Sequence, residues 1–257
     1  MDTDRIHRLE WKVKGLVGLL AAACAALAYA GPPFVTDDPD PVGLGSWEIN
    51  YGMTANHTAG TTSGFLPSID INYGAAPGVQ LHAQPQVAYT SGGDGHAYGV
   101  GDTELGIKYR FTSESDNPRD WMIGAYPMLE LPTGDAARGL GAGAHSIYVP
   151  IWFQTTRGRW TAFGGGGYWF NYGEGSKNAW AGGWTMLYQV HKDLQLGGEI
   201  FATTPNIVDG SSSSGFNLGG VYQLGERCSL LFSAGHGIKN AASNNQGSVY
   251  LGLRTAF

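Results

Sequence analysis

Charged and apolar side chains alternate along residues 100–111. The charged positions are Asp102, Glu104, Lys108 and Arg110. The intervening positions include Leu105 and Ile107, which are apolar. Successive side chains of a β-strand point to opposite faces, so the charges would share one face. A Lys or Arg facing the middle of a bilayer costs about 2–4 kcal/mol. In a membrane-spanning strand, these charges would therefore have to line an enclosed lumen.

Six further ionisable residues lie at positions of other alternating segments where the side chain would point to this same inner face. They are Glu48, Asp70, His82, Glu130, Glu199 and Arg254. Together the ten residues predict an interior that carries both signs of charge, with a mild acidic excess. Two interpretations remain open. The charges could form a lining that selects solutes, or a set of ion pairs that closes the interior.

Histidine and serine residues, some of them close together in the sequence, are candidates for nucleophilic catalysis. The candidates are His82, His145 beside Ser146, and His236 near Ser233. Such chemistry needs a nucleophile, a base and an orienting group, and no G-x-S-x-G elbow is present. The four glycines at 164–167 precede neither a helix nor a lysine, so they do not resemble a phosphate-binding loop. We therefore predict no enzyme activity, no catalytic residues, no metal and no cofactor.

Alternation of the same kind extends from residue 45 to the end of the chain. It predicts about twelve strands, near 46–53, 68–74, 79–89, 100–111, 121–131, 145–154, 159–170, 179–190, 194–202, 215–224, 228–238 and 247–257. No helix is expected in this part of the chain, because the 3.6-residue period is missing. The predicted fold is all-β, a transmembrane antiparallel β-barrel over residues 45–257.

The connections between these segments alternate in length. Long polar connections are expected at 57–64, 91–99, 132–143, 171–178, 203–214 and 239–246, and short ones at 75–78, 155–159, 191–193 and 225–228. Residues 113–120 form a longer connection at a place in the chain where the alternation predicts a short one. Outer-membrane barrels have long loops at one rim and tight turns at the periplasmic rim. Both termini are therefore expected to be periplasmic.

A soluble β-sandwich or lipocalin-like barrel is the structural alternative, since it also alternates. It would bury the apolar faces, and its interior would then be crowded with Trp and Tyr. Aromatic residues near the expected strand ends instead suit the two interfaces with outer-membrane lipid. The last strand ends in Phe257, which resembles the signal that the outer-membrane assembly machinery reads. We expect that machinery to be a partner.

Residues 1–30 have the order of a secretory signal peptide. Four basic residues precede the apolar run 15–28, and Ala-Tyr-Ala ends at Ala30. The run is too short to span a bilayer, which disfavours an uncleaved anchor. Lipidation at Cys24 is a further alternative, but the three residues before it are all alanine. Cleavage would leave Cys228 as the only cysteine, so no intramolecular disulfide could form. The predicted location is the outer membrane of a Gram-negative bacterium.

Residues 31–44 form a Pro- and Asp-rich arm before the first strand. Asp37, Asp38 and Asp40 could bind a cation such as Ca²⁺, but Asp beside Pro is typical of turns. Proline also prevents pairing in the middle of a sheet. We therefore favour turns, and hypothesise that the arm enters the lumen as a partial plug against Lys108, Arg110 or Arg254.

Several stretches resemble a known family. They are residues 31–52, ELPTGDAARGLGAG at 130–143, TAFGGGGYWFN at 161–171, QLGGEIF at 195–201, FNLGGVY at 216–222 and LLFSAG at 230–235. The chain is similar to the bacterial family of outer-membrane proteins named for the MetA pathway of phenol degradation. The resemblance implies an outer-membrane barrel that moves aromatic or other hydrophobic compounds. It supplies no site residues.

The sequence as a whole predicts an outer-membrane channel for the passive passage of small solutes. The formal net charge of −6, without a Lys/Arg cluster, argues against nucleic acid as a partner. A structural or adhesive barrel with a closed lumen is the alternative, with loops 132–143 and 203–214 binding partners. An outer-membrane hydrolase is a third, less favoured interpretation.

Overall fold

A computed structural model describes residues 32–93, 95–112 and 120–257. The predicted signal peptide and most of the segment 113–120 lie outside the described residues. Fifteen strands form one sheet: β1 (Trp47–Thr58), β2 (Thr61–Ala76), β3 (Val79–Gln84), β4 (Gln86–Gly92), β5 (Gly95–Val100), β6 (Thr103–Arg110), β7 (Met122–Ala125), β8 (Met128–Leu131), β9 (Ser146–Arg157), β10 (Trp160–Asn171), β11 (Ala179–His191), β12 (Leu194–Thr203), β13 (Ser213–Gly225), β14 (Cys228–Lys239) and β15 (Gly247–Ala256).

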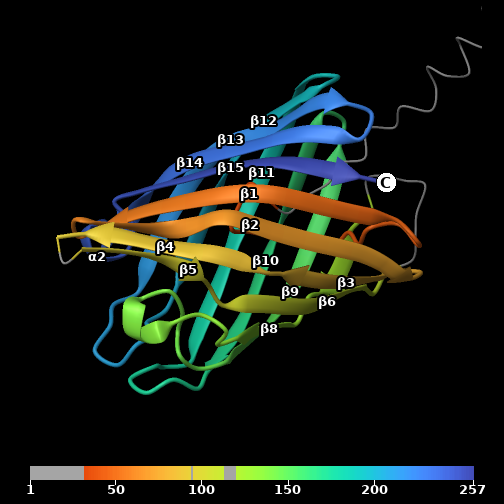
Figure 1. Ribbon diagram of the computed structural model, residues 1–257. Coiled ribbons are helices and arrows are strands. Elements are labelled where there is room, and N and C mark those ends of the chain that lie inside the picture. Colours follow the sequence, from red (N-terminus) through yellow and green to blue (C-terminus); the bar gives the residue numbers. More distant parts are fainter. Residues whose placement is uncertain (1–31, 94, 113–119) are drawn as a thin grey trace, which may run out of the picture.

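The sheet closes on itself to form a barrel (Figure 1). Strand β1 pairs antiparallel with β15 on one side and with β2 on the other, which joins the start of the sheet to its end. Every crossing of the wall corresponds to one predicted segment, so the prediction of a twelve-strand barrel is confirmed. The strand count is higher because three crossings are interrupted, at Pro85, at 101–102 and at 126–127. Proline cannot donate to a ladder, which explains the breaks beside Pro85 and Pro127.

The outer face of the barrel is apolar. In β6, Leu105, Ile107 and Tyr109 are 40–49% exposed, whereas Lys108 between them is only 4% exposed. The same alternation appears in β15, where Leu251 and Leu253 are exposed and Arg254 is buried. The wall therefore turns its apolar side outward and its polar side inward. This is the arrangement that a hydrocarbon surrounding requires.

Two predicted long loops are wrong. Residues 57–64 form a tight hairpin, because Ala59 and Gly60 both have positive φ (50° and 81°) and let β1 turn directly into β2. Residues 91–99 fall largely within the β4–β5 hairpin, paired from Val87 with Val100 to Gly92 with Gly95. Polar and glycine-rich composition suggested loops at both places, but the tip of a hairpin can be polar on both faces while its strands stay paired.

The expectation of no helix also needs correction. The 3₁₀ turn η1 (Ala136–Arg138) and the single-turn helix α2 (Ala241–Asn244) lie in connections between strands. Neither is part of the wall. Among the described residues, no helix is long and apolar enough to cross a membrane.

The two rims of the barrel differ. The chain end lies at one rim, where Trp47 N–H and Phe257 N–H each donate to the other residue's carbonyl oxygen. The η1 and α2 connections lie at the opposite rim (Figure 1). We call these the terminal rim and the loop rim.

Candidate functional site

The N-terminal arm, residues 32–44, runs through the interior of the barrel and touches opposite walls. Near its start, the carbonyl oxygen of Pro33 accepts a hydrogen bond from Ser233 Oγ of β14, at 2.6 Å. Near its end, Val42 N–H donates to Gln80 Oε1 of β3, at 2.9 Å. Thr36, Asp38, Pro39 and Val42 are buried. The arm therefore fills much of the lumen nearest the terminal rim.

Inward-facing glycines provide space for the arm. A Cβ at Gly183 of β11 would overlap Thr36 Oγ1, and one at Gly74 of β2 would overlap the carbonyl oxygen of Gly43. At Gly124 of β7, a Cβ would come within 3.1 Å of the Pro39 Cβ. Any other residue at these three positions would push the arm away from the wall. The wall and the arm are thus complementary in shape.

Ion pairs hold the middle of the arm. Lys108 Nζ lies 3.0 Å from Asp37 Oδ1 and 3.7 Å from Asp38 Oδ1, and Arg110 Nη1 lies 3.2 Å from Asp40 Oδ1. Burial raises the pKa of the Asp38 carboxyl well above its ordinary value, and the nearby Lys108 only partly opposes this effect. Desolvation favours the neutral form of a buried acid. Among the described residues, no three His, Cys, Asp or Glu side chains are grouped so that they could hold a metal ion.

Glu199 of β12 holds the first part of the arm. Its two carboxylate oxygens accept hydrogen bonds from the backbone N–H groups of Val35 and Thr36, both at 2.8 Å. Asn217 Nδ2 donates a further bond to Oε1 at 2.6 Å. Glu199 is only 3% exposed. These three donors replace the water that would otherwise solvate its carboxylate. An anion on the wall therefore recognises the backbone of the arm rather than a side chain.

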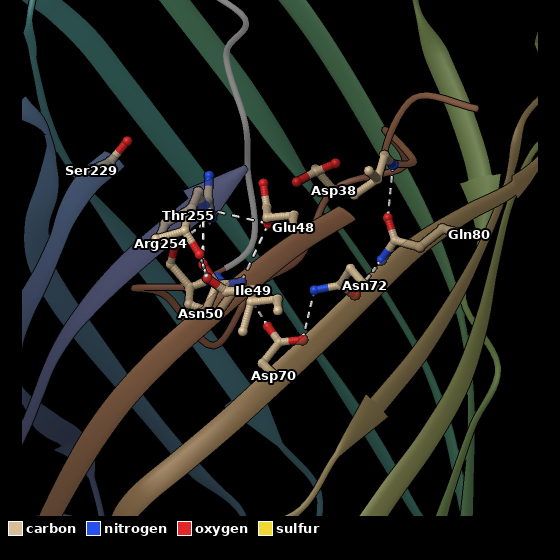
Figure 2. Close-up of polar contacts among 12 residues, drawn as sticks. Asp38, Glu48, Ile49, Asn50, Asp70, Asn72, Gln80, Ser229, Arg254 and Thr255 are labelled. Atoms are coloured by element: carbon tan, nitrogen blue, oxygen red, sulfur yellow. Dashed lines mark hydrogen bonds and ion pairs between the residues drawn. The ribbon is translucent and has the colours of Figure 1, made fainter. Parts of the chain in front are cut away.

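A ladder of hydrogen-bonded polar side chains runs from strand to strand along the inner face of the wall, beside the arm (Figure 2). Arg254 Nε donates to Asn50 Oδ1 at 2.9 Å, and Asn50 Nδ2 donates to Asp70 Oδ2 at 2.9 Å. Asn72 Nδ2 then donates to Asp70 Oδ1 at 2.6 Å. The ladder continues through Gln80 Nε2, which donates to Asn72 Oδ1 at 2.6 Å. It reaches the arm through the bond from Val42 to Gln80.

Glu48 and His82 extend this ladder in two directions. Glu48 Oε1 lies 3.4 Å from Arg254 Nε. His82 lies between two carboxylates, with Nδ1 3.1 Å from Asp70 Oδ1 and Nε2 3.2 Å from Glu104 Oε1. Both flanking groups are acidic side chains of neighbouring strands. These contacts tie β1, β2, β3, β6 and β15 together.

All ten residues predicted to line the lumen have inward parity in the structure. Glu48, Asp70, His82, Asp102, Lys108, Glu199 and Arg254 are at most 8% exposed, while Glu104, Arg110 and Glu130 are partly buried. Eight of them belong to the arm contacts and the ladder just described. The other two lie toward the loop rim, where Glu130 accepts a bond from Ser146 and Asp102 binds the loop after β8. Whether any of them selects solutes stays a prediction.

An open cavity of about 660 Å³ lies between the arm and the loop rim. Its floor is formed by Pro33, Phe34 and Val35, and Val35 is 68% exposed there. Apolar residues share the lining with hydroxyl and amide groups; they include Phe65, Ala88 and Phe201 of the wall and Leu140 of the loop after β8. We call this space the vestibule. Below it, the space between arm and wall shrinks to a crevice of about 30 Å³ beside Glu48, Asp70 and Lys108.

Sequence reasoning missed the glycine contacts and the role of Glu199 in binding the arm. The inward parity of Gly74 and Gly183 was a usable signal, because a glycine on the polar face leaves room for something else. The amide members of the ladder, Asn50, Asn72 and Gln80, were recognisable from parity alone. Their partners were not, because pairing depends on the register between strands.

Two of the histidines that are candidates for catalysis contact groups other than serine hydroxyls. His145 stacks on Tyr172 with ring centroids 4.4 Å apart, while Ser146 Oγ donates to Glu130. His236 Nδ1 is within hydrogen-bond distance of the Gly237 carbonyl oxygen. In the described part of the chain, no serine hydroxyl is hydrogen-bonded to a histidine.

The comparisons with known proteins agree with this architecture. A family model described as "Putative MetA-pathway of phenol degradation" matches residues 56–255. An outer membrane channel from Pseudomonas putida F1 superposes with a TM-score of 0.67 at 16% identity, covering 86% of this chain and 98% of that one. The KdgM porin gives 0.57 at 13% identity (82% and 99% covered), and the NanC porin 0.55 at 7% (81% and 98%). No curated protein sequence matches the chain.

Proposed function

The chain belongs to the family described as "Putative MetA-pathway of phenol degradation", and from this membership and the interior just described we propose that it is an outer-membrane channel for the passive passage of small solutes. It lies in the outer membrane of a Gram-negative bacterium, with the terminal rim in the periplasm and the loop rim outside. Solved barrels of the same fold are named as channels and porins, which supports this assignment.

The vestibule is the observation that carries the proposal. It opens toward the loop rim, its volume of about 660 Å³ falls in the range of small-molecule sites, and it ends at the arm. Exposed Val35 and partly exposed Phe34 on its floor favour aromatic or hydrophobic solutes, the class that the family name suggests. The charged ladder below provides no comparable apolar surface.

The N-terminal arm acts as a plug in this proposal. Its ion pairs and hydrogen bonds close the terminal half of the lumen, and a crevice of about 30 Å³ lies beside it. Passage through the barrel axis therefore requires the arm to leave its seat. The predicted selectivity lining of Asp70, Lys108, Glu199 and their neighbours would then face the solute.

Reconstitution tests the proposal. The purified chain should release small neutral solutes from liposomes, and a strain that lacks it should take up phenol-like compounds more slowly. Absence of liposome permeability, of bilayer conductance and of any uptake defect would refute a channel.

A barrel with a closed lumen is the competing function, and the seated arm is the observation in its favour. In that case, the loops at 132–143 and 203–214 would bind partners. Deleting either loop would then abolish partner binding and leave solute flux unchanged.

A further inference from the structure

The barrel wall has an unpaired seam near the loop rim. Strand β5 pairs with β4 along one edge, and none of the described strands pairs with its other edge. The neighbouring β6 is fully engaged, with β3 on one side and β7 and β8 on the other. Pairing between strands is therefore continuous from the terminal rim to Gly101. From Gly101 toward the loop rim, one edge of β5 has no strand beside it among the described residues. An open sheet edge facing lipid is costly unless protein covers it.

The loop after β8 covers this seam. Thr133 Oγ1 donates to the Gly101 carbonyl oxygen at 2.8 Å, at the point where ladder pairing ends. Farther along, Arg138 Nη2 donates to the Tyr98 carbonyl oxygen at 3.3 Å, and this is the one hydrogen bond to the outer edge of β5 among the described residues. The buried side chain of Leu140 packs at Gly99. Figure 1 shows the η1 turn of this loop, in green, beside β5.

Asp102 anchors the loop at both ends. Its Oδ1 accepts a hydrogen bond from Gly134 N–H at 2.9 Å, and its Oδ2 accepts one from Ala142 N–H at 2.6 Å. Between these two points, Arg138 donates one hydrogen bond to β5 and the Leu140 side chain packs at Gly99. The loop is thus fixed at its base and weakly held where it meets the strand edge.

The vestibule reaches this seam from inside. Its lining includes Ala88 and Asp102 on the β5 side, Glu130 on the β8 side, and residues 139–142 between them. On the outer surface, Tyr98 and Val100 of β5 are 59% and 63% exposed, so the seam borders an apolar exterior. A small uncharged apolar molecule on this path would meet Ala88 and Leu140 on the inside and Tyr98 and Val100 on the outside.

We propose that the seam between β5 and the loop 132–143 is a side portal, through which small apolar molecules pass between the vestibule and the surrounding membrane. This inference rests on the proposed channel function and adds a second route to it. Movement of residues 138–141 away from β5 opens the portal, and the arm stays seated. Polar solutes instead take the axial route, which requires the arm to leave.

A reversible crosslink tests the portal. In a Cys228→Ser background, Gly99→Cys and Leu140→Cys can be joined by oxidation. A Cβ at Gly99 would lie 3.2 Å from the Leu140 Cδ1, and shortening Leu140 relieves that contact. The probes are the apolar dye N-phenylnaphthylamine and the polar sugar arabinose, each followed in proteoliposomes. Reduction of the same sample provides the unlocked control, so a folding defect cannot imitate the result.

We expect oxidation to lower transfer of the apolar dye at least tenfold and to leave arabinose flux unchanged, with recovery on reduction. Deletion of residues 31–42 should do the opposite, raising arabinose flux with little effect on the dye. Dye transfer that is equal in the oxidised and reduced samples would overturn the portal. Loss of dye and arabinose flux together on oxidation would overturn it too, since it would indicate one shared axial route. Arabinose flux that fails to rise on arm deletion would instead count against the proposed channel.

Discussion

The backbone N–H of Thr36 donates a 2.8 Å hydrogen bond to Oε2 of Glu199, a residue 163 positions farther along the chain. This contact joins the arm to the far wall of the barrel. Hydrogen bonds to charged groups contribute about 1.5–3 kcal/mol, and Glu199 makes a second one with Val35 N–H. The seated position of the arm is therefore a specific docked state.

Glu199→Gln should loosen the arm, because it removes the charge that strengthens both bonds. A loss of about 1.5 kcal/mol corresponds to roughly a tenfold rise in the open fraction. Single-channel recording measures that fraction directly. Glu226→Gln, in an exposed turn, is the matched control and should leave it unchanged. An equal open fraction in both variants would show that Glu199 does not hold the arm.

Gly183→Val should displace the arm by steric conflict. Its Cβ would overlap Thr36 Oγ1, and the backbone beside it leaves little room to relax. We expect residues near 36 to become sensitive to protease in the folded barrel, while they resist in the wild type. Gly93→Ala is the control, since no atom lies within 4 Å of its Cβ position. Protection of the arm in the Gly183→Val protein would contradict the glycine seat.

Acid should strengthen docking of the arm through Asp38. Burial raises the pKa of this carboxyl in the docked state, whereas a free aspartate titrates near 3.9. A raised pKa in the docked state means that the stabilising contribution is complete below about pH 4 and is lost as the pH rises through the docked value. Channel opening should therefore increase from acidic to neutral pH.

Asp38→Asn tests the assignment of this pH dependence. The amide imitates the protonated acid, so the variant should open less than the wild type at neutral pH and vary less with pH. Bilayer recordings at a series of pH values supply the comparison. An unaltered pH profile in Asp38→Asn would place the titrating group elsewhere.

A lysine on the outer face should destabilise the barrel. Ile107 of β6 is 49% exposed on the apolar side, and Ile107→Lys should lower the free energy of unfolding by about 2–4 kcal/mol if the site lies near the bilayer midplane. Val208→Lys is the control, because Val208 is 59% exposed in a connection between strands. Denaturant titration in lipid vesicles measures both. Equal stabilities would contradict a lipid-facing β6.

Much of the wall was predictable from sequence because side-chain parity is a local property. Alternation around Lys108 and Arg254 predicted burial for both, and each side chain is at most 4% exposed. Interruptions were harder to predict. Pro85 breaks the ladder without breaking the alternation, so β3 and β4 read as one strand.

The long-range contacts between the arm and the wall could not be predicted from the sequence, for a physical reason. Parity places Glu199 inside but does not reveal whether it faces water, another strand or the arm. The sequence raised Lys108, Arg110 and Arg254 as partners of the arm, and the structure places all three in contact with it. Binding by Glu199 and by Ser233 involves backbone groups of the arm, which carry no residue-specific signal.

Planar-bilayer conductance of the mature chain with and without residues 31–42 tests the plug most directly. We expect small or rare current steps for the complete chain and steps several-fold larger or more frequent after deletion, with barrel folding confirmed by circular dichroism. Identical conductance for the two folded proteins would contradict it.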